Sequence, residues 1–243
     1  MNNDPENIRR VHKIKKVLCV ISILILISCI ILIFIQKNYY KLDTAINKVQ
    51  TKEKIEKIKF PSDKNNNGIN DLGDILIGAR QEVKNKTKYK NAYYVGGYPP
   101  ISEGVCTDVV WRALRNAGYN LKTYIDKDIK DNLSDYSGSV KSIDPNIDFR
   151  RVKNQYIFFK KFATNLTLDV IPYNKSNLAF WQAGDIVVLA KPEHIAIVSD
   201  KRRIDGVPFI IHNNYLYAKE EDYLMDWSNK KRIIGHFRFP KIR

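Results

Sequence analysis

The stretch EGVCTDVVWRALRNAG, residues 103–118, predicts an amphipathic helix that carries a cysteine in its first turn. Its apolar residues recur at helical spacing, and Gly118 is placed to end the helix. We therefore expect Cys106 to stand at the start of a helix whose apolar face packs on a core. That face consists of Val109, Val110, Ala113, Leu114 and Ala117.

Four short segments in the last third of the chain predict an antiparallel sheet. They are rich in β-branched and aromatic residues, and turn residues separate them. The segments are DIVVLAK (185–191), HIAIVSD (194–200), PFIIHNN (208–214) and IIGHFRF (233–239).

The segments upstream of this sheet are mixed. DLGDILIGARQEVKN, residues 71–85, has Leu72, Ile75, Leu76, Ala79 and Val83 on one helical face. A short strand and an irregular approach to Cys106 are expected within 92–105, and 120–177 is expected to be an insertion packed on the core, with a helix around 154–163. The fold class is therefore α+β, with the cysteine-bearing helix packed on an antiparallel sheet.

The N-terminal part contains a predicted membrane anchor. Residues 17–35 form a run of nineteen residues without a charge, about the length that crosses a hydrocarbon core of roughly 30 Å. Five basic residues precede it, so the positive-inside rule places the N-terminus in the cytoplasm and the rest outside the cell. Two alternatives remain open, a cleaved signal peptide and a lipid-modified Cys29 in LISC (26–29).

These patterns divide the chain into five parts. They are a cytoplasmic basic tail (1–16), a transmembrane anchor (17–36), a helical stalk (37–60), a calcium-binding-like loop (61–74) and one domain (75–243).

The net charge is +15, and the first 36 residues carry five basic and two acidic side chains, which leaves about +12 outside the membrane. This charge suits an anionic envelope polymer or lipid headgroups, and it also fits a composition that is rich in Lys, Asn and Ile throughout, as in a low-GC Gram-positive bacterium. The exported location argues against nucleic acid as a partner.

Cys106 is the only cysteine outside the apolar segment. A lone exported cysteine is a buried apolar residue, a site of intermolecular pairing, or a reactive thiol. At a helix start, unpaired backbone N–H groups favour the thiolate and can also hold an oxyanion. A base is then needed, and His194, which opens the strand 194–200, is the candidate. His212 or Asn213, at the end of the next strand, is expected to hold the His194 ring in the productive tautomer. A strand-edge histidine is also often structural.

The loop PSDKNNNGINDLGD, residues 61–74, has the spacing of a calcium loop. Counting from Asp63, oxygen ligands fall at positions 1, 3, 5, 7, 9 and 12, and Gly68 stands at position 6. The candidate ligands are Asp63, Asn65, Asn67, Ile69 through its carbonyl, Asp71 and Asp74. We expect a structural Ca²⁺ ion with a dissociation constant of about 10⁻⁴ to 10⁻³ M. An Asn-rich turn without a metal is the alternative, and no organic cofactor is expected.

Several motifs together resemble a known family. GGYPPISEGVCTDVVWRALRNAG, DPNIDFRRVKN, AGDIVVL, HIAIVSD and IIHNN occur in an order that resembles the bacterial envelope proteins of domain-of-unknown-function family 1287. That family is itself similar to NlpC-type cysteine peptidases and amidases of the papain-like fold. The resemblance implies that Cys106 is the nucleophile, His194 the general base and His212 the third residue. The chain departs from NlpC-type enzymes where Val105 precedes the cysteine and Thr107 and Asp108 follow it.

The resemblance and the envelope location predict an anchored extracellular cysteine peptidase or amidase that acts on cell-wall peptidoglycan peptides through an acyl-enzyme. A catalytically silent wall-binding module and an acyl or amide transferase are the alternatives. Arg150 and Arg151 are candidates to clamp a substrate carboxylate, although arginine pairs often form structural ion pairs. The oligomeric state is not predicted.

Overall fold

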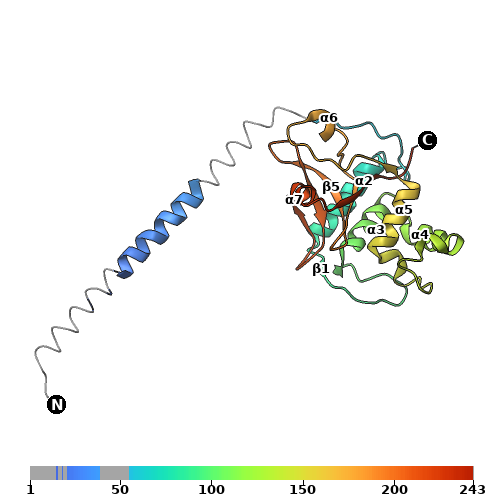
Figure 1. The fold of residues 1–243 in the computed structure, drawn as a ribbon, viewed down its shortest axis with the longest axis horizontal. Coiled ribbons are helices and arrows are strands. Elements are labelled where there is room, and N and C mark those ends of the chain that lie inside the picture. Colours follow the sequence, from blue (N-terminus) through green and yellow to red (C-terminus); the bar gives the residue numbers. More distant parts are fainter. Residues whose placement is uncertain (1–14, 16–17, 19–20, 39–54, 243) are drawn as a thin grey trace, which may run out of the picture. The chain divides into compact units, whose positions relative to one another are not determined.

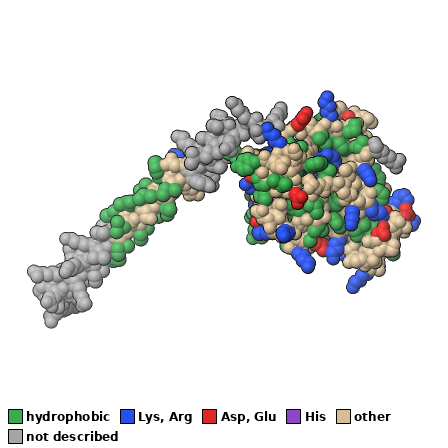
Figure 2. All heavy atoms as spheres, turned by 45° about the horizontal axis from the view of Figure 1, so that its top comes forward, with side chains coloured by type: hydrophobic (Ala, Val, Ile, Leu, Met, Phe, Trp, Pro, Cys, Tyr) green, Lys and Arg blue, Asp and Glu red, His purple; other side chains and the backbone are tan. Residues whose placement is uncertain are grey.

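The structure is a computed structural model of the chain that describes residues 15, 18, 21–38 and 55–242. The chain divides into two compact units, residues 1–52 and 53–243, which are described separately. In the first unit, residues Ile21–Asn38 form a helix that is long and apolar enough to cross a membrane. Its large apolar side chains, including Leu32 and Phe34, are exposed (Figure 2).

Most of the predicted stalk, residues 39–54, lies outside the described residues. Residues 55–60 are described and are not helical, so the prediction of a stalk helix up to residue 60 is wrong there. The physical reason is that this segment packs along the domain. Gln182 donates a hydrogen bond to the carbonyl of Glu56 at 3.0 Å, and Ile55 and Phe60 pack against buried apolar clusters.

The second unit has a mixed helix and sheet fold, as expected for an α+β protein (Figure 1). Its six-stranded sheet is antiparallel throughout and has the order β3-β8-β4-β5-β6-β7. The strands are β3 (Thr164–Asn165), β4 (Ile186–Leu189), β5 (His194–Arg202), β6 (Pro208–His212), β7 (Lys219–Glu221) and β8 (Ile233–Arg238). The four predicted strands are thus confirmed, and the short β3 and β7 extend the sheet at its two edges.

The helices cover both faces of this sheet. Figure 1 shows α3, α4 and α5 on one side and α7 on the other. The α-helices are α2 (Asp71–Lys84), α3 (Cys106–Asn116), α4 (Leu121–Asp131), α5 (Val152–Phe162), α6 (Lys175–Leu178) and α7 (Leu224–Asn229), and the 3₁₀ turns are η1 (Leu133–Tyr136) and η2 (Asp148–Arg150). The helices predicted around residues 71–85, 103–118 and 154–163 are confirmed.

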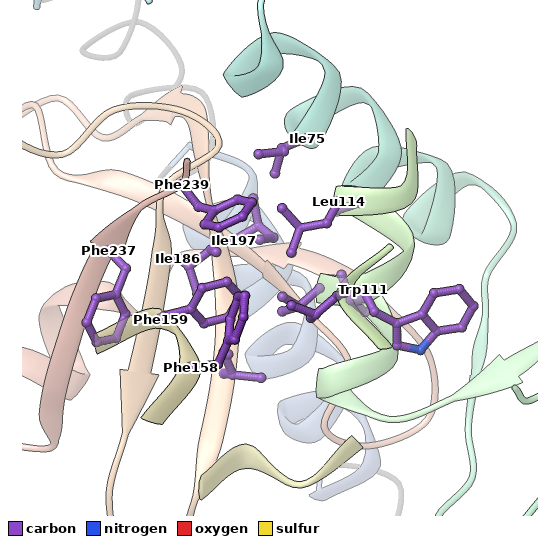
Figure 3. Packing of buried hydrophobic residues seen from close by; sticks show 14 of the residues in the cluster. Ile75, Trp111, Leu114, Phe158, Phe159, Ile186, Ile197, Phe237 and Phe239 are labelled. Atoms are coloured by element: carbon purple, nitrogen blue, oxygen red, sulfur yellow. The ribbon is translucent and has the colours of Figure 1, made fainter. Parts of the chain in front are cut away.

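Alternation along the strands creates two cores. Ile195 and Ile197 of β5 pack into a cluster with α2, α3 and α5, whereas Ala196 and Val198 face a second cluster that contains Trp181 and Trp227. Figure 3 shows the first cluster, in which aromatic rings from α5 and β8 meet aliphatic side chains of the sheet and of α2 and α3. The sheet is therefore buried on both faces.

Two glycines allow α2 to approach its neighbours closely. A Cβ atom at Gly78 would lie 2.8 Å from the Cα of Ala113, so α2 and α3 meet at a residue without a side chain. Gly184 has a φ of +87°, and a Cβ atom there would lie 2.5 Å from the carbonyl oxygen of Leu72. The start of β4 is thus fixed against the start of α2.

Residues 92–105 are irregular except for the short strand Glu103–Gly104, so the predicted short strand lies at the end of this range. A parallel pair, β1 (Lys88–Tyr89) and β2 (Glu103–Gly104), flanks an irregular loop. The loop turns at Gly97, whose N–H bonds to the carbonyl of Tyr94 at 2.9 Å. β2 delivers the chain directly to the start of α3.

Candidate active site

Cys106 is the first residue of α3, as predicted. The preceding residue, Val105, has no side chain that can cap the helix. The Asp108 carboxylate instead accepts a hydrogen bond from the Val105 N–H at 2.7 Å. The Cys106 sulfur lies against three backbone N–H groups, those of Ile195, Thr107 and Cys106 itself, each of which lowers the pKa of the thiol. Because Ile195 follows His194, this contact brings the thiol beside the start of β5.

A buried ion pair holds the first turn of α3 in place. Arg150 donates to both carboxylate oxygens of Asp108, and its third contact is a hydrogen bond from Nη1 to the carbonyl of Ala92 at 2.9 Å. Asp108 also accepts a hydrogen bond from Trp111 Nε1 at 2.7 Å. The Thr107 hydroxyl donates to the carbonyl of Arg150 at 2.8 Å. The turn that carries the cysteine is therefore fixed from both sides.

This arrangement corrects the expectation that Arg150 clamps a substrate carboxylate. Its side chain is about 1% exposed and is engaged by Asp108, so it lies in the structural ion pair that was the alternative. Arg151 differs, since its side chain is 45% exposed and its Nε lies 3.2 Å from Asp148 Oδ1. The two adjacent arginines thus face different surroundings and do not form one clamp.

The two predicted histidines are brought together across β5 and β6. His194 Nε2 lies 2.6 Å from His212 Nδ1, and His212 Nε2 lies 3.2 Å from Oε2 of Glu221 on β7. Trp227 of α7 packs edge-on against both rings, with centroid distances of 5.6 and 5.5 Å. The result is a row of two buried imidazoles and a partly exposed carboxylate that runs across three strands.

Asn213, the alternative third residue, has a different role. It is fully buried, and its Nδ2 donates to the carbonyls of Thr87 and Gly104, both at 3.1 Å. These bonds tie the end of β6 to β1 and β2. Asn213 therefore positions the segment that leads to Cys106, whereas His212 is the residue that contacts the His194 ring.

Burial keeps both reactive groups neutral in this structure. Desolvation raises the pKa of Cys106 to about 11, although the three N–H groups oppose the rise. Desolvation, together with the nearby His212 and Arg232, lowers the pKa of His194 to about 3. Each residue is about 8% exposed. No hydrogen bond joins the thiol to the His194 ring within residues 55–242, and the contact between the two residues runs through the backbone of Ile195, which follows His194.

Two further side chains lie near this pair. Burial raises the pKa of the Tyr89 phenol, and Cys106 adds to the rise, which indicates that Tyr89 of β1 lies near the thiol. Arg232, directly before β8, lies close enough to add to the lowering of the His194 pKa, which is caused mainly by burial. Its Nη2 donates to the carbonyl of Pro192 at 3.2 Å, and among the described residues it has no carboxylate partner. The Arg232 guanidinium is therefore available to bind an anion near His194.

Sequence reasoning did not find Glu221, Arg232 or Trp227. Glu221 lies in a short polar segment that carries no strand pattern, and Arg232 lies in a run of basic residues, KKR. The pairing of distant strands and the packing of α7 bring these residues to the histidines. His236, which was set aside, is buried elsewhere, stacked on Trp181 with a hydrogen bond from its ring to the carbonyl of Thr167.

The predicted calcium loop adopts a compact turn at the start of α2. Both Asp63 oxygens accept backbone N–H groups, from Asn67 at 3.2 Å and Gly68 at 2.9 Å, and Gly68 has a φ of +86°. The side-chain amides of Asn65 and Asn67 donate to Asp74. Asp71 accepts hydrogen bonds from Tyr119 and from the Lys64 N–H. Within the described ranges, no group of three or more acidic, histidine or cysteine residues could hold a metal ion.

The loop therefore closes through its own hydrogen bonds. The Asn65 and Asn67 amides present N–H groups to Asp74, where calcium would require their oxygens. The Ile69 N–H bonds to Oδ1 of Asn67 at 2.8 Å. Calcium binding by this loop remains a prediction, and it would need these amides to turn.

A separate cavity of about 430 Å³ lies between α4 and α5, away from Cys106 and His194. Its walls are largely aromatic and it is bordered by acidic residues of α4. It is lined by Tyr124, Lys127, Asp128, Asp131, Asn132, Phe158, Phe162 and Phe239.

Comparison with known proteins identifies a family. The model of the family described as Domain of unknown function (DUF1287) matches residues 76–239. The chain is also similar to the uncharacterized protein YijF of Escherichia coli (strain K12), with 37% identity over 174 residues that cover 68% of this chain and 80% of YijF. No solved structure gives a significant match. With most of its folded part matched by the family model, this chain belongs to the DUF1287 family.

Proposed function

We propose that this protein is a membrane-anchored extracellular cysteine hydrolase of the peptidase or amidase type. The observation that carries the proposal is the placement of Cys106 at the start of α3, against the N–H of Ile195, the residue that follows His194 of the His194–His212 pair. A candidate nucleophile, main-chain donors for an oxyanion and the strand start that carries a candidate base thus meet at one end of β5. The papain-like and NlpC-type relationship belongs to the same proposal.

The chemistry follows from these positions. The thiol proton passes to His194, and the sulfur attacks the carbonyl carbon of a substrate amide. The N–H groups of Cys106, Thr107 and Ile195 are the candidates to stabilise the resulting oxyanion. The protonated His194 then donates its proton to the leaving amine, which leaves an acyl-thioester. A water molecule, deprotonated by His194, hydrolyses the thioester and restores the thiol.

The buried state of the site bears on how it works. A neutral thiol and a neutral imidazole favour proton transfer during the attack over a preformed thiolate–imidazolium pair. Entry of a substrate also requires the residues that bury Cys106 to move, since the Cys106 side chain is about 8% exposed. The same burial supports the second candidate, a catalytically silent module that binds the cell wall.

The proposed substrate is a peptide of the cell wall. The apolar helix 21–38 fits an anchor in the cell membrane, and the net charge of +15 fits an anionic envelope polymer. Arg232 adds a local reason, because its guanidinium has no carboxylate partner among the described residues, lies close enough to lower the pKa of His194, and suits a substrate with a carboxylate near the scissile bond. An acyl or amide transferase would use the same thioester with an amine or alcohol in place of water.

The experiment uses the full-length protein in detergent micelles and purified peptidoglycan fragments. Mass spectrometry follows the fragments after incubation with wild type, Cys106→Ala and His194→Ala. Cys29→Ser is the matched control, because it removes a free thiol of the apolar helix and leaves the site intact. We expect cleaved products with wild type and Cys29→Ser only. Identical fragments in all samples would contradict hydrolysis and favour the binding module, and products that carry an added amine or alcohol would indicate a transferase.

A further inference from the structure

His212 uses both of its ring nitrogens, and its partners are chemically different. Its Nδ1 faces His194 Nε2 at 2.6 Å, and its Nε2 faces the Glu221 carboxylate at 3.2 Å. A neutral imidazole has one donor nitrogen and one acceptor nitrogen, whereas a carboxylate only accepts. The Glu221 contact therefore places the His212 proton on Nε2 and leaves Nδ1 as the acceptor.

The tautomer of His212 determines the tautomer of His194. Because His212 Nδ1 accepts, His194 must donate from Nε2, and its own Nδ1 then carries a lone pair. That nitrogen has no hydrogen-bond partner among residues 55–242, and it is the only one of the four ring nitrogens left free to take a proton. The base form of His194 is thus determined from a carboxylate two strands away.

The Glu221 side chain is held in place by Lys219 and by the pairing of β7 with β6. Its Oε1 lies 3.2 Å from Nζ of Lys219, two residues earlier on β7, and its side chain is about 25% exposed. Backbone pairing of His212 with Lys219 fixes β7 against the end of β6. Lys219 binds one oxygen of the carboxylate, and the other oxygen lies at His212 Nε2. The row from Lys219 to His194 is continuous, and it begins at the surface and ends at the buried ring of His194.

We propose that Glu221 is a positioning residue of this site, which acts through His212 to set the His194 tautomer that can accept the Cys106 proton. The inference rests on the proposed function for its catalytic meaning, but the tautomer itself is a property of the resting protein. The other groups that face the two rings are Trp227 and Tyr223 from the α7 side, Arg232 near His194, and Lys219. None of these supplies a second acceptor for His212 Nε2 in the described part of the chain.

The test is nuclear magnetic resonance of the full-length protein in micelles, labelled with ¹⁵N at its four histidines. Proton–nitrogen correlation spectra of the wild type should show His194 and His212 both protonated at Nε2. Glu221→Leu removes the acceptor and should leave a mixture of tautomers at both rings. Asp222→Asn is the matched control, since it removes a neighbouring carboxylate that pairs with Arg203 at 3.5 Å.

A second readout measures the reactivity of Cys106. Its alkylation rate, resolved by mass spectrometry of the Cys106 peptide, should fall in Glu221→Leu by roughly 10- to 100-fold, by analogy with the loss of a carboxylate that orients a metal-bound histidine. Glu221→Asp should restore part of the rate, and Asp222→Asn should leave it unchanged. If Glu221→Leu does not fold, Glu221→Gln keeps the shape and tests the loss of charge.

The outcomes separate this inference from the proposed function. Unchanged tautomers in a folded Glu221→Leu overturn the role of Glu221, whatever the activity. A tautomer change with no cleavage of peptidoglycan by the wild type leaves Glu221 as the residue that sets the tautomer and removes the hydrolase proposal. A change in both tautomer and reactivity supports the two together.

Discussion

The carboxylate of Asp108 lies 2.7 and 2.8 Å from Nε and Nη2 of Arg150, in a pair that spans 42 residues of sequence. Both side chains are about 1% exposed. A bidentate pair of this kind gives direction as well as strength, and here it orients the turn that carries Cys106. Loss of either partner leaves a buried charge without compensation.

Arg150→Leu should therefore destabilise the protein strongly. We expect a loss of about 3–5 kcal/mol in the free energy of unfolding, because Asp108 remains buried without its partner. Chemical denaturation of the full-length protein in micelles measures this loss. Arg151→Leu, one residue away and largely exposed, should cost less than about 1 kcal/mol. Equal effects of the two variants would contradict the assigned role of Arg150.

Gly184→Ala should also destabilise, for steric reasons. Its φ of +87° is unfavourable for alanine, and the new Cβ would meet the Leu72 carbonyl at 2.5 Å. We expect a loss of about 1–3 kcal/mol or more, since main-chain atoms must move. Gly138→Ala is the control, because nothing lies within 4 Å of its Cβ position. A comparison of the two unfolding temperatures tests the prediction.

Acid should destabilise the folded domain through its buried histidines. The pKa of His194 is lowered to about 3 from an ordinary value of 6.5, so between these values the unfolded chain binds more protons than the folded one. Stability is full above about pH 6.5 and falls on acidification towards pH 3, by at most about 1.4 kcal/mol per pH unit for this residue. His194→Gln should reduce the slope of stability against pH in this window. An unchanged slope would show that His194 is not desolvated.

The reactivity of Cys106 should depend steeply on alkaline pH. Because burial raises the pKa of the thiol to about 11, the thiolate fraction grows about tenfold per pH unit from pH 7 to 10. The rate of alkylation by a small reagent, measured on the Cys106 peptide, should follow this rise without a plateau below pH 10. A plateau near pH 7 would instead indicate a preformed thiolate. Added ligand that opens the site should shift the curve to lower pH.

Calcium provides a test of the loop at residues 63–74. If the Asn65 and Asn67 amides turn to present oxygens, calcium at ten times its dissociation constant should stabilise the protein by about 1.4 kcal/mol. Thermal unfolding with millimolar Ca²⁺, with Mg²⁺ and with a chelator measures the effect. Asp63→Asn should abolish it, since Asp63 is the first ligand of the predicted loop. The same melting temperature in all three conditions would leave a turn held by hydrogen bonds alone.

The sequence predicted the parts of this fold that repeat a pattern. The apolar spacing of α2, α3 and α5 and the four β-branched segments led to the correct elements, and the strand order brought His194 beside His212. The parts that were missed have no period to detect. The strands β3 and β7 have two and three residues, and they exist because they pair with longer neighbours.

The candidate site, like the fold, could be predicted from the sequence only in part. Cys106 and His194 stand at element boundaries that local sequence can indicate. Glu221 and Arg232 come to the histidines only through pairing of distant strands, and the partner of Arg150 lies 42 residues away. Long-range partners of charged residues are set by tertiary structure, so an arginine pair in the sequence is compatible with both a clamp and an internal ion pair.

The donors around the Cys106 sulfur belong to the peptide backbone, so the identity of the flanking side chains leaves them in place. Valine before the cysteine and Thr-Asp after it retain every one of those N–H groups. Apart from proline, no coded residue can delete one. Only semisynthesis that swaps a single amide for an ester, at Thr107 or Ile195, would remove one donor while keeping the side chains unaltered.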